Sequence, residues 1–140
     1  MIPSSIANRY KAVQVKTCSP GEIVVLLYQG VLRFLGEAAA AMRAGDRARA
    51  GDRIDRAHAI LGELATTLRR EEAPALCDEL QAIYFFCMGH IVEANLHQDP
   101  ARLDAAVRVL SPLSEAFTQA VRATETTAAP APTVSIAVGA

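Results

Sequence analysis

The amino-acid sequence predicts an all-α protein, an antiparallel up-down four-helix bundle. Hydrophobic residues make up 51% of the 140 residues, while aromatic residues make up 5% and Trp is absent, which suits packed helices better than sheets. Apolar residues recur at spacings of three and four in successive segments, as on one face of a helix. Capping residues and prolines separate these segments by short connections, which favour antiparallel neighbours. The length suits one domain.

The first helix is expected over residues 19–44. Ser19 can cap its start, Pro20 suits its first turn, and Glu22 completes a capping box. Gly45 supplies the stop. Its apolar stripe consists of Val24, Leu27, Val31, Phe34, Leu35, Ala38 and Met42, and is widened by Ile23, Leu26 and Leu32. A stripe this wide indicates contact with more than one neighbour.

Two further helices are expected over residues 47–70 and 74–97. Asp46 is a plausible cap for the first of them, and Pro74 can open the second. The helix over 47–70 has a narrow apolar seam of Ile54, Ala57, Leu61, Leu64 and Leu68. The helix over 74–97 has two stripes, one of Leu76, Leu80, Ile83, Cys87, Ile91 and Ala94, the other of Tyr84, Met88, Val92 and Leu96. The first and third helices therefore carry more apolar surface than one seam uses.

The fourth helix is expected to open at Asp99-Pro100 and to end the bundle at residue 122. Pro112 interrupts it, which predicts either a kink near residues 108–111 or two shorter helices. Its buried side is marked by Leu103, Ala106, Val107, Leu110, Leu113, Phe117 and Val121. We expect an N-terminal segment over 1–18, the bundle over 19–122, and a disordered tail, rich in Thr, Ala and Pro, over 123–140.

The charge distribution argues against binding of nucleic acid. The formal net charge is −1, from 14 basic and 15 acidic residues, and no long block of one sign occurs. A local basic cluster alternates with aspartates, which is typical of a solvated face. It consists of Arg43, Arg47, Arg49, Arg53 and Arg56, interleaved with Asp46, Asp52 and Asp55.

Cysteine usage and hydropathy predict a cytoplasmic protein without membrane insertion. Cys18, Cys77 and Cys87 form no CxxC pair, which indicates free thiols in a reducing compartment. Residues 1–16 lack the apolar region of a signal peptide. The longest strongly apolar run is Ile23 to Leu27, far short of the roughly 20 residues of a membrane span.

The residue patterns favour a binding protein over an enzyme, with no metal and no cofactor. His90, Glu93 and His97 share one helix face, with Cys87 one turn earlier. A surface metal site or a catalytic thiol is one reading of this group. The favoured reading is a polar stripe on a solvated face beside a buried cysteine that behaves as a small hydrophobe, because spacing alone does not assemble a coordination shell.

Gly30 lies inside the first predicted helix, where glycine costs about 1 kcal/mol relative to alanine. The favoured explanation is the close approach of another helix or of the N-terminal segment. The alternative is a shallow notch that receives a ligand side chain.

The segment from Tyr10 to Gly30 resembles the opening signature of the FliS family. That signature is a tyrosine, a Thr-Ala-Ser-Pro turn and an apolar helix with Leu-Tyr-Asp-Gly; here Cys18 replaces the alanine and Gln29 the aspartate. Further matches follow in order at Gly45-Asp46, Ala57–Leu61, Leu80–Tyr84 and Glu93–Asp99. The resemblance covers about residues 6–121, and Phe117 takes the place of the tryptophan usual near the end of the fourth helix.

The resemblance implies a cytoplasmic chaperone that binds the C-terminal helical region of flagellin. Such a chaperone blocks premature polymerisation and delivers flagellin to the flagellar type III export gate. It also implies that the N-terminal segment packs on the bundle and occupies part of the flagellin surface. Tyr10 matches the family's N-terminal tyrosine, and Ile6 falls just before it.

We therefore expect residues of the N-terminal segment, the first helix and the third helix to line or support grooves that take an amphipathic helix. These residues are Ile6, Tyr10, Tyr28, Tyr84, Met88 and Asn95. For Tyr28 and Tyr84 the alternative is internal packing with satisfied hydroxyls. The alternative function is that of a non-flagellar helical adaptor or regulator, and the sequence leaves the oligomeric state open.

Overall fold

The structure, a computed structural model, describes residues 21–128, with side chains to residue 124. In this range it consists of four helices: α2 (Gly21–Arg43), α3 (Arg47–Thr66), α4 (Pro74–His97) and α5 (Pro100–Ala128). The predicted all-α class is confirmed. The expected cap at Ser19, the packing of residues 1–18 and the tail after residue 128 lie outside the described residues.

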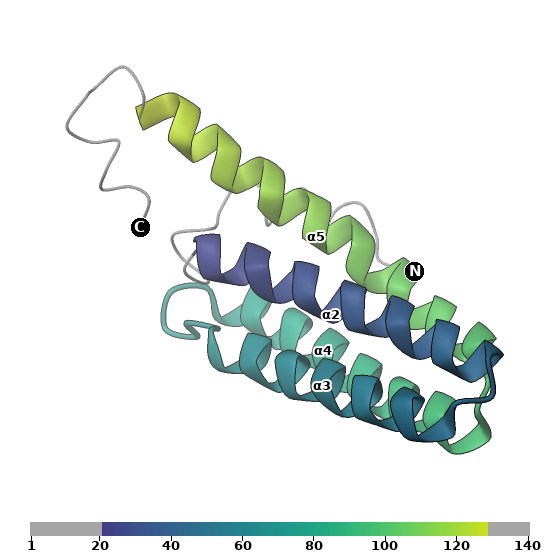
Figure 1. Cartoon of the computed structure of the whole chain (residues 1–140). Coiled ribbons are helices and arrows are strands. Elements are labelled where there is room, and N and C mark those ends of the chain that lie inside the picture. The colour runs from purple at the N-terminus through teal and green to yellow at the C-terminus, as the bar shows by residue number, and fades with distance from the viewer. Residues whose placement is uncertain (1–20, 129–140) are drawn as a thin grey trace.

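The helices are arranged around the bundle in chain order. α2 packs against α3 and α5, and α4 packs against the same two helices, so α2 and α4 face each other diagonally across the core. Figure 1 shows α2 between α5 and α3, with the last turns of α5 extending beyond the start of α2. Short connections join consecutive antiparallel helices, which confirms the predicted up-down bundle.

The turn between α2 and α3 has the predicted stop and cap. Gly45 has a φ of 76°, and its N–H donates to the Met42 carbonyl at 3.1 Å. The Asp46 N–H donates to the Ala41 carbonyl at 2.9 Å, so two carbonyls at the end of α2 are satisfied. The Asp46 carboxylate accepts the Arg49 N–H at 3.1 Å and caps α3.

α3 ends at Thr66, so the predicted end at residue 70 was wrong. The Thr66 hydroxyl donates to the Glu63 carbonyl, and the Thr67 hydroxyl donates to the Leu64 carbonyl, both at 2.7 Å. Threonine side chains that bond nearby carbonyls compete with continued helix. Leu68 extended the apolar spacing and still packs against the core, but from a loop.

α4 and α5 begin as predicted, at Pro74 and at Asp99-Pro100. The Asp99 carboxylate accepts the Ala101 N–H at 3.1 Å. α5 is one continuous helix through Pro112 and runs to Ala128, so both the division into two shorter helices and the end at residue 122 were wrong. Proline removes a single backbone hydrogen bond, and buried residues on both sides of it hold this part of the helix against the core.

The predicted apolar stripes form one common core. The residues of these stripes that are buried include Val24, Val31, Leu35, Ile54, Leu61, Leu80, Ile91, Leu103, Leu110 and Phe117. A Cβ atom placed on Gly30 would lie 3.1 Å from Cδ1 of Ile60. The close approach of another helix, the favoured explanation for this glycine, is therefore confirmed, and the helix is α3.

α2 is the one described helix that is long and apolar enough, by length and composition, to cross a membrane. The sequence prediction, which counted only the run from Ile23 to Leu27, missed this. In the structure the helix contributes Val24, Tyr28, Val31 and other residues to the bundle core. Packing between α3 and α5 therefore accounts for part of its apolar character.

We predict that Asp46→Ala lowers the free energy of unfolding by about 1 kcal/mol, because α3 loses the acceptor for one of its free N–H groups. Urea unfolding followed by circular dichroism measures the change. Asp55→Ala removes the same charge from the exposed middle of α3 and is the matched control. An equal loss in both variants would contradict a capping role.

Candidate functional site: exposed apolar faces of α2 and α4

The exposed large hydrophobic residues of the described chain all lie on α2 and α4. They are Ile23 and Leu26 on α2, and Phe85, Phe86, Val92 and Leu96 on α4, between 48% and 69% exposed. The prediction that the first and third helices have apolar surface to spare is therefore confirmed. A monomer that leaves such side chains in water on two helices has surface suited to a partner.

The outer face of α4, defined by Phe85, Phe86, Val92 and Leu96, runs along successive turns. Phe85, Val92 and Leu96 stand at i, i+7 and i+11, with Gly89 at i+4. A Cβ atom placed on Gly89 would meet no atom within 4 Å, so the glycine leaves an open notch between larger side chains. α4 is apolar on its core side as well, which is unusual for a helix with one face in water.

A groove of about 380 Å³ lies between the first half of α2 and the last third of α5. It is lined by Glu22, Val25, Leu26, Gln29, Thr118, Val121 and Arg122. Leu26 gives it an exposed apolar wall, and Glu22 and Arg122 supply charges of opposite sign. Such a groove suits an apolar side chain flanked by polar groups.

Tyr28 and Tyr84 are fully buried beneath these surfaces. Their hydroxyl oxygens are 2.7 Å apart and share a hydrogen bond that joins α2 to α4 across the core. The Tyr28 ring also packs against Phe117 of α5, with ring centroids 5.3 Å apart. Of the two readings of these tyrosines, internal packing with satisfied hydroxyls describes their placement.

The other predicted partner-binding residues differ in their setting. Met88 is half-buried and packs against the core from α4. Asn95 is half-buried near the end of α4, where its side-chain and backbone oxygens accept hydrogen bonds from Gln98 at 3.0 and 2.8 Å. This contact supports the helix end, since Gln98 has a left-handed backbone with φ of 50°. Ile6 and Tyr10 lie outside the described residues.

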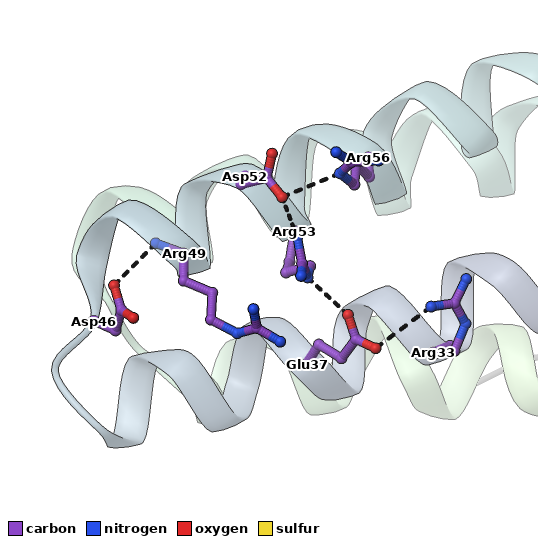
Figure 2. Close-up of polar contacts among 7 residues, drawn as sticks. All are labelled: Arg33, Glu37, Asp46, Arg49, Asp52, Arg53 and Arg56. Carbon is purple, nitrogen blue, oxygen red and sulfur yellow. Dashed lines mark hydrogen bonds and ion pairs between the residues drawn. The ribbon is translucent and has the colours of Figure 1, made fainter.

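A polar network joins α2 to α3, and Figure 2 shows its ion pairs. Glu37 of α2 contacts Arg33 at 3.4 Å and Arg53 of α3 at 2.7 Å. Asp52 pairs with Arg53 and lies 3.1 Å from Arg56. The hydrogen bond from Arg56 is the main cause of the lowered pKa of Asp52, which keeps this carboxylate charged. The basic cluster is thus partly a contact between helices.

The group of Cys87, His90, Glu93 and His97 offers neither a reactive thiol nor a metal cluster in the described chain. Cys87 is buried, and burial raises the pKa of its thiol to about 12. The His90 ring stacks on the Phe86 ring. Nδ1 of His97 lies 3.8 Å from Oε1 of Glu93 and forms a hydrogen bond with the backbone carbonyl of Glu93 at 3.0 Å. No three potential ligands gather in residues 21–128 to hold a metal.

Sequence reasoning missed Phe85 and Phe86 as exposed residues. The signal was present in the spacing of Phe85, Val92 and Leu96, but Gly89 interrupts it. It also missed the contact between Glu37 and Arg53, because these residues are on different helices and no periodicity relates them.

The chain matches known proteins over most of its length. The model of the family described as "Flagellar protein FliS" matches residues 3–124. The flagellar secretion chaperone FliS of Bacillus subtilis is 31% identical over 121 residues, which are 84% of this chain and 90% of that protein. FliS of Campylobacter jejuni is 31% identical over 110 residues, 79% of this chain and 86% of that protein. FliSB of Pseudomonas aeruginosa is 32% identical over 97 residues, 69% and 77% of the two chains.

We predict that Tyr28→Phe and Tyr84→Phe each lower the free energy of unfolding by about 1–3 kcal/mol, because each removes the hydrogen bond between the two buried hydroxyls. The double variant should lose less than the sum of the single losses, by about 1 kcal/mol. Urea unfolding of the four proteins measures this coupling. Additive losses would show that the hydroxyls act independently.

The raised pKa of Cys87 predicts a pH dependence of stability. The unfolded thiol ionises near pH 9.0, whereas the folded thiol keeps its proton until about pH 12. The contribution of the buried Cys87 thiol to the free energy of unfolding is therefore complete below pH 9.0 and is lost as the pH rises toward 12. Cys87→Ala should weaken this alkaline loss of stability, as measured by urea unfolding between pH 8 and 10.5 or so. An unchanged slope would mean that Cys87 ionises normally in the folded protein.

Proposed function

Because the chain belongs to the flagellar protein FliS family, we propose that it is a cytoplasmic chaperone that binds the C-terminal helical region of flagellin. It blocks premature polymerisation and delivers flagellin to the flagellar type III export apparatus. The relatives are named flagellar secretion chaperones, and membership of their family supports a role in flagellar export.

The outer face of α4 is the observation that carries the proposal. Fully burying one large apolar side chain contributes roughly 1.5–3 kcal/mol. The side chains of this face are about half exposed, so a client that covers all of them recovers a substantial part of that energy for each. An amphipathic helix fits such a surface, because its own apolar stripe has the same spacing along the helix. The notch at Gly89 lets the backbone or a large side chain of the client approach closely.

The diagonal arrangement of α2 and α4 determines how a client must bind. The exposed residues of α2, Ile23 and Leu26, and the outer face of α4 point away from the core in different directions. One straight helix therefore cannot cover both. We infer that the client contributes more than one segment, one to the outer face of α4 and another to the groove between α2 and α5.

The predicted partner-binding residues have separate roles in this proposal. Tyr28 and Tyr84 support both faces from the core, while Met88 lies between the core and the outer face of α4. Asn95 holds the end of α4 in place. From the resemblance to the family, Ile6 and Tyr10 belong to a segment that competes with the client for this surface.

The test is binding of purified flagellin to the full-length chain, by co-purification and calorimetry, with intact flagellin and with flagellin that lacks its C-terminal region. We expect the truncation to abolish binding, and Phe85→Gln with Leu96→Gln to weaken binding of intact flagellin at least about tenfold. The melting temperature should change little, because both side chains are exposed.

The matched control is Ala59→Gln with Arg108→Gln, which places glutamine at exposed positions of α3 and α5. This variant should bind like the unaltered chain. Equal binding of truncated flagellin would contradict the proposed client region. An unchanged affinity of the Phe85 and Leu96 variant would contradict the outer face of α4 as the binding surface.

A further inference from the structure

Three guanidinium groups surround one aromatic ring at the edge between α2 and α3. The guanidinium carbon of Arg33 lies 4.5 Å from the centroid of the Phe34 ring, and those of Arg53 and Arg56 lie 6.0 and 5.9 Å from it. These distances fall within reach of cation–π attraction. The side chains of Arg33 and Arg56 are 62% and 58% exposed, so the two outer guanidiniums are presented to solvent in positions that the ring helps to fix.

The carboxylates of this network orient the guanidiniums without neutralising them. Glu37 and Asp52 are shared among three arginines, so the network keeps a surplus positive charge. Arg33 reaches Glu37 through Nη1, and Arg56 reaches Asp52 through Nε. A guanidinium has five N–H donors in a rigid fork. Most donors of Arg33 and Arg56 therefore remain available to an external acceptor.

Arg49 adds a further positive charge to the same edge. Its backbone N–H is bound by Asp46, but its guanidinium makes no ion pair with any residue in the described range. Figure 2 shows the Arg49 side chain extending from α3 toward α2, as the Arg53 side chain does. Among the residues that Figure 2 draws, four arginines stand against the carboxylates of Glu37, Asp46 and Asp52, which leaves one surplus positive charge at this edge of a chain whose net charge is −1.

We propose that this edge is a docking surface for a helical protein segment that carries carboxylates one or two turns apart. The arginine surface, as we call it, consists of Arg33, Phe34, Glu37, Arg49, Asp52, Arg53 and Arg56. Carboxylates can bind guanidiniums bidentately, and a helical segment presents carboxylates about 5.4 Å apart for each turn, so two of them can each meet one of the exposed guanidiniums beside the Phe34 ring.

A segment with separate carboxylates fits this surface better than a polyphosphate. Glu37 and Asp52 lie between the arginines and would repel a continuous row of phosphates, whereas carboxylates spaced along a helix can pass them. The arginine surface shares no residue with the outer face of α4 or with the groove between α2 and α5. The partner therefore uses residues that the proposed client does not, and the inference goes beyond the proposed function.

The experiment uses the full chain and needs no flagellin. The probe is a fluorescent alanine-based helical peptide with glutamates at positions i and i+4, compared with the same peptide carrying glutamines. Anisotropy is measured at about 50 and 300 mM salt. The glutamate peptide should bind at least about tenfold more tightly than the glutamine peptide, and more weakly at the higher salt concentration.

Arg33→Gln with Arg56→Gln should remove this preference. The matched control, Arg69→Gln with Arg108→Gln, removes the same charge from exposed arginines that form no ion pair with a residue of the described range, and it should retain the preference. Arg33→Lys with Arg56→Lys keeps the charge but loses the fork, so it should lose part of the affinity. If the glutamine variant does not fold, the lysine variant tests the role of Arg33 and Arg56 in its place.

Three results would overturn the proposal. Equal losses in the control and in the Arg33 and Arg56 variant would show diffuse attraction to net charge. Equal binding of the glutamate and glutamine peptides would show that carboxylates are not recognised. Binding of a short DNA duplex as tight as that of the glutamate peptide would assign the surface to phosphates.

Discussion

The hydrogen bond between the Tyr28 and Tyr84 hydroxyls is the contact on which the arrangement of the surface depends. It joins α2 and α4, one of the two diagonal pairs of the bundle, and lies in a fully buried core. Rotating either helix about its axis would move one hydroxyl away from the other and would break this bond between buried groups. The same contact that fixes the rotation of α2 and α4 therefore fixes which of their apolar side chains remain outside, Leu26 on one helix and Phe85 on the other.

The fold could be predicted from the sequence because its signals are local. The stop at Gly45, the cap at Asp46 and the prolines at the starts of α4 and α5 each act within one turn, and the structure has them where they were expected. The boundaries that were predicted wrongly, the end of α3 and the break in α5, depend on interactions that the spacing of apolar residues does not reveal. Threonine hydroxyls end α3 early, and packing on both sides of Pro112 keeps α5 continuous.

The candidate site could be predicted only in part. That α2 and α4 have spare apolar surface followed from the width of their stripes, but α4 carries two apolar stripes, so periodicity could not say which of its apolar residues are in water. The choice between groove and core for Tyr28 and Tyr84 also depended on which helices are diagonal, which is a tertiary property. The pairing of Glu37 with Arg53 joins two helices and leaves no pattern within either.

Gly89 affects the stability of the folded chain when no ligand is bound. Glycine at the centre of a helix face costs about 1 kcal/mol of helix stability relative to alanine, and here no neighbour fills the space. The unliganded chain is thus less stable than an alanine at this position would make it, on the helix face where its exposed apolar side chains lie. A ligand that binds at this notch would stabilise the folded chain by mass action, so the resistance of the chain to proteolysis would depend on the concentration of that ligand.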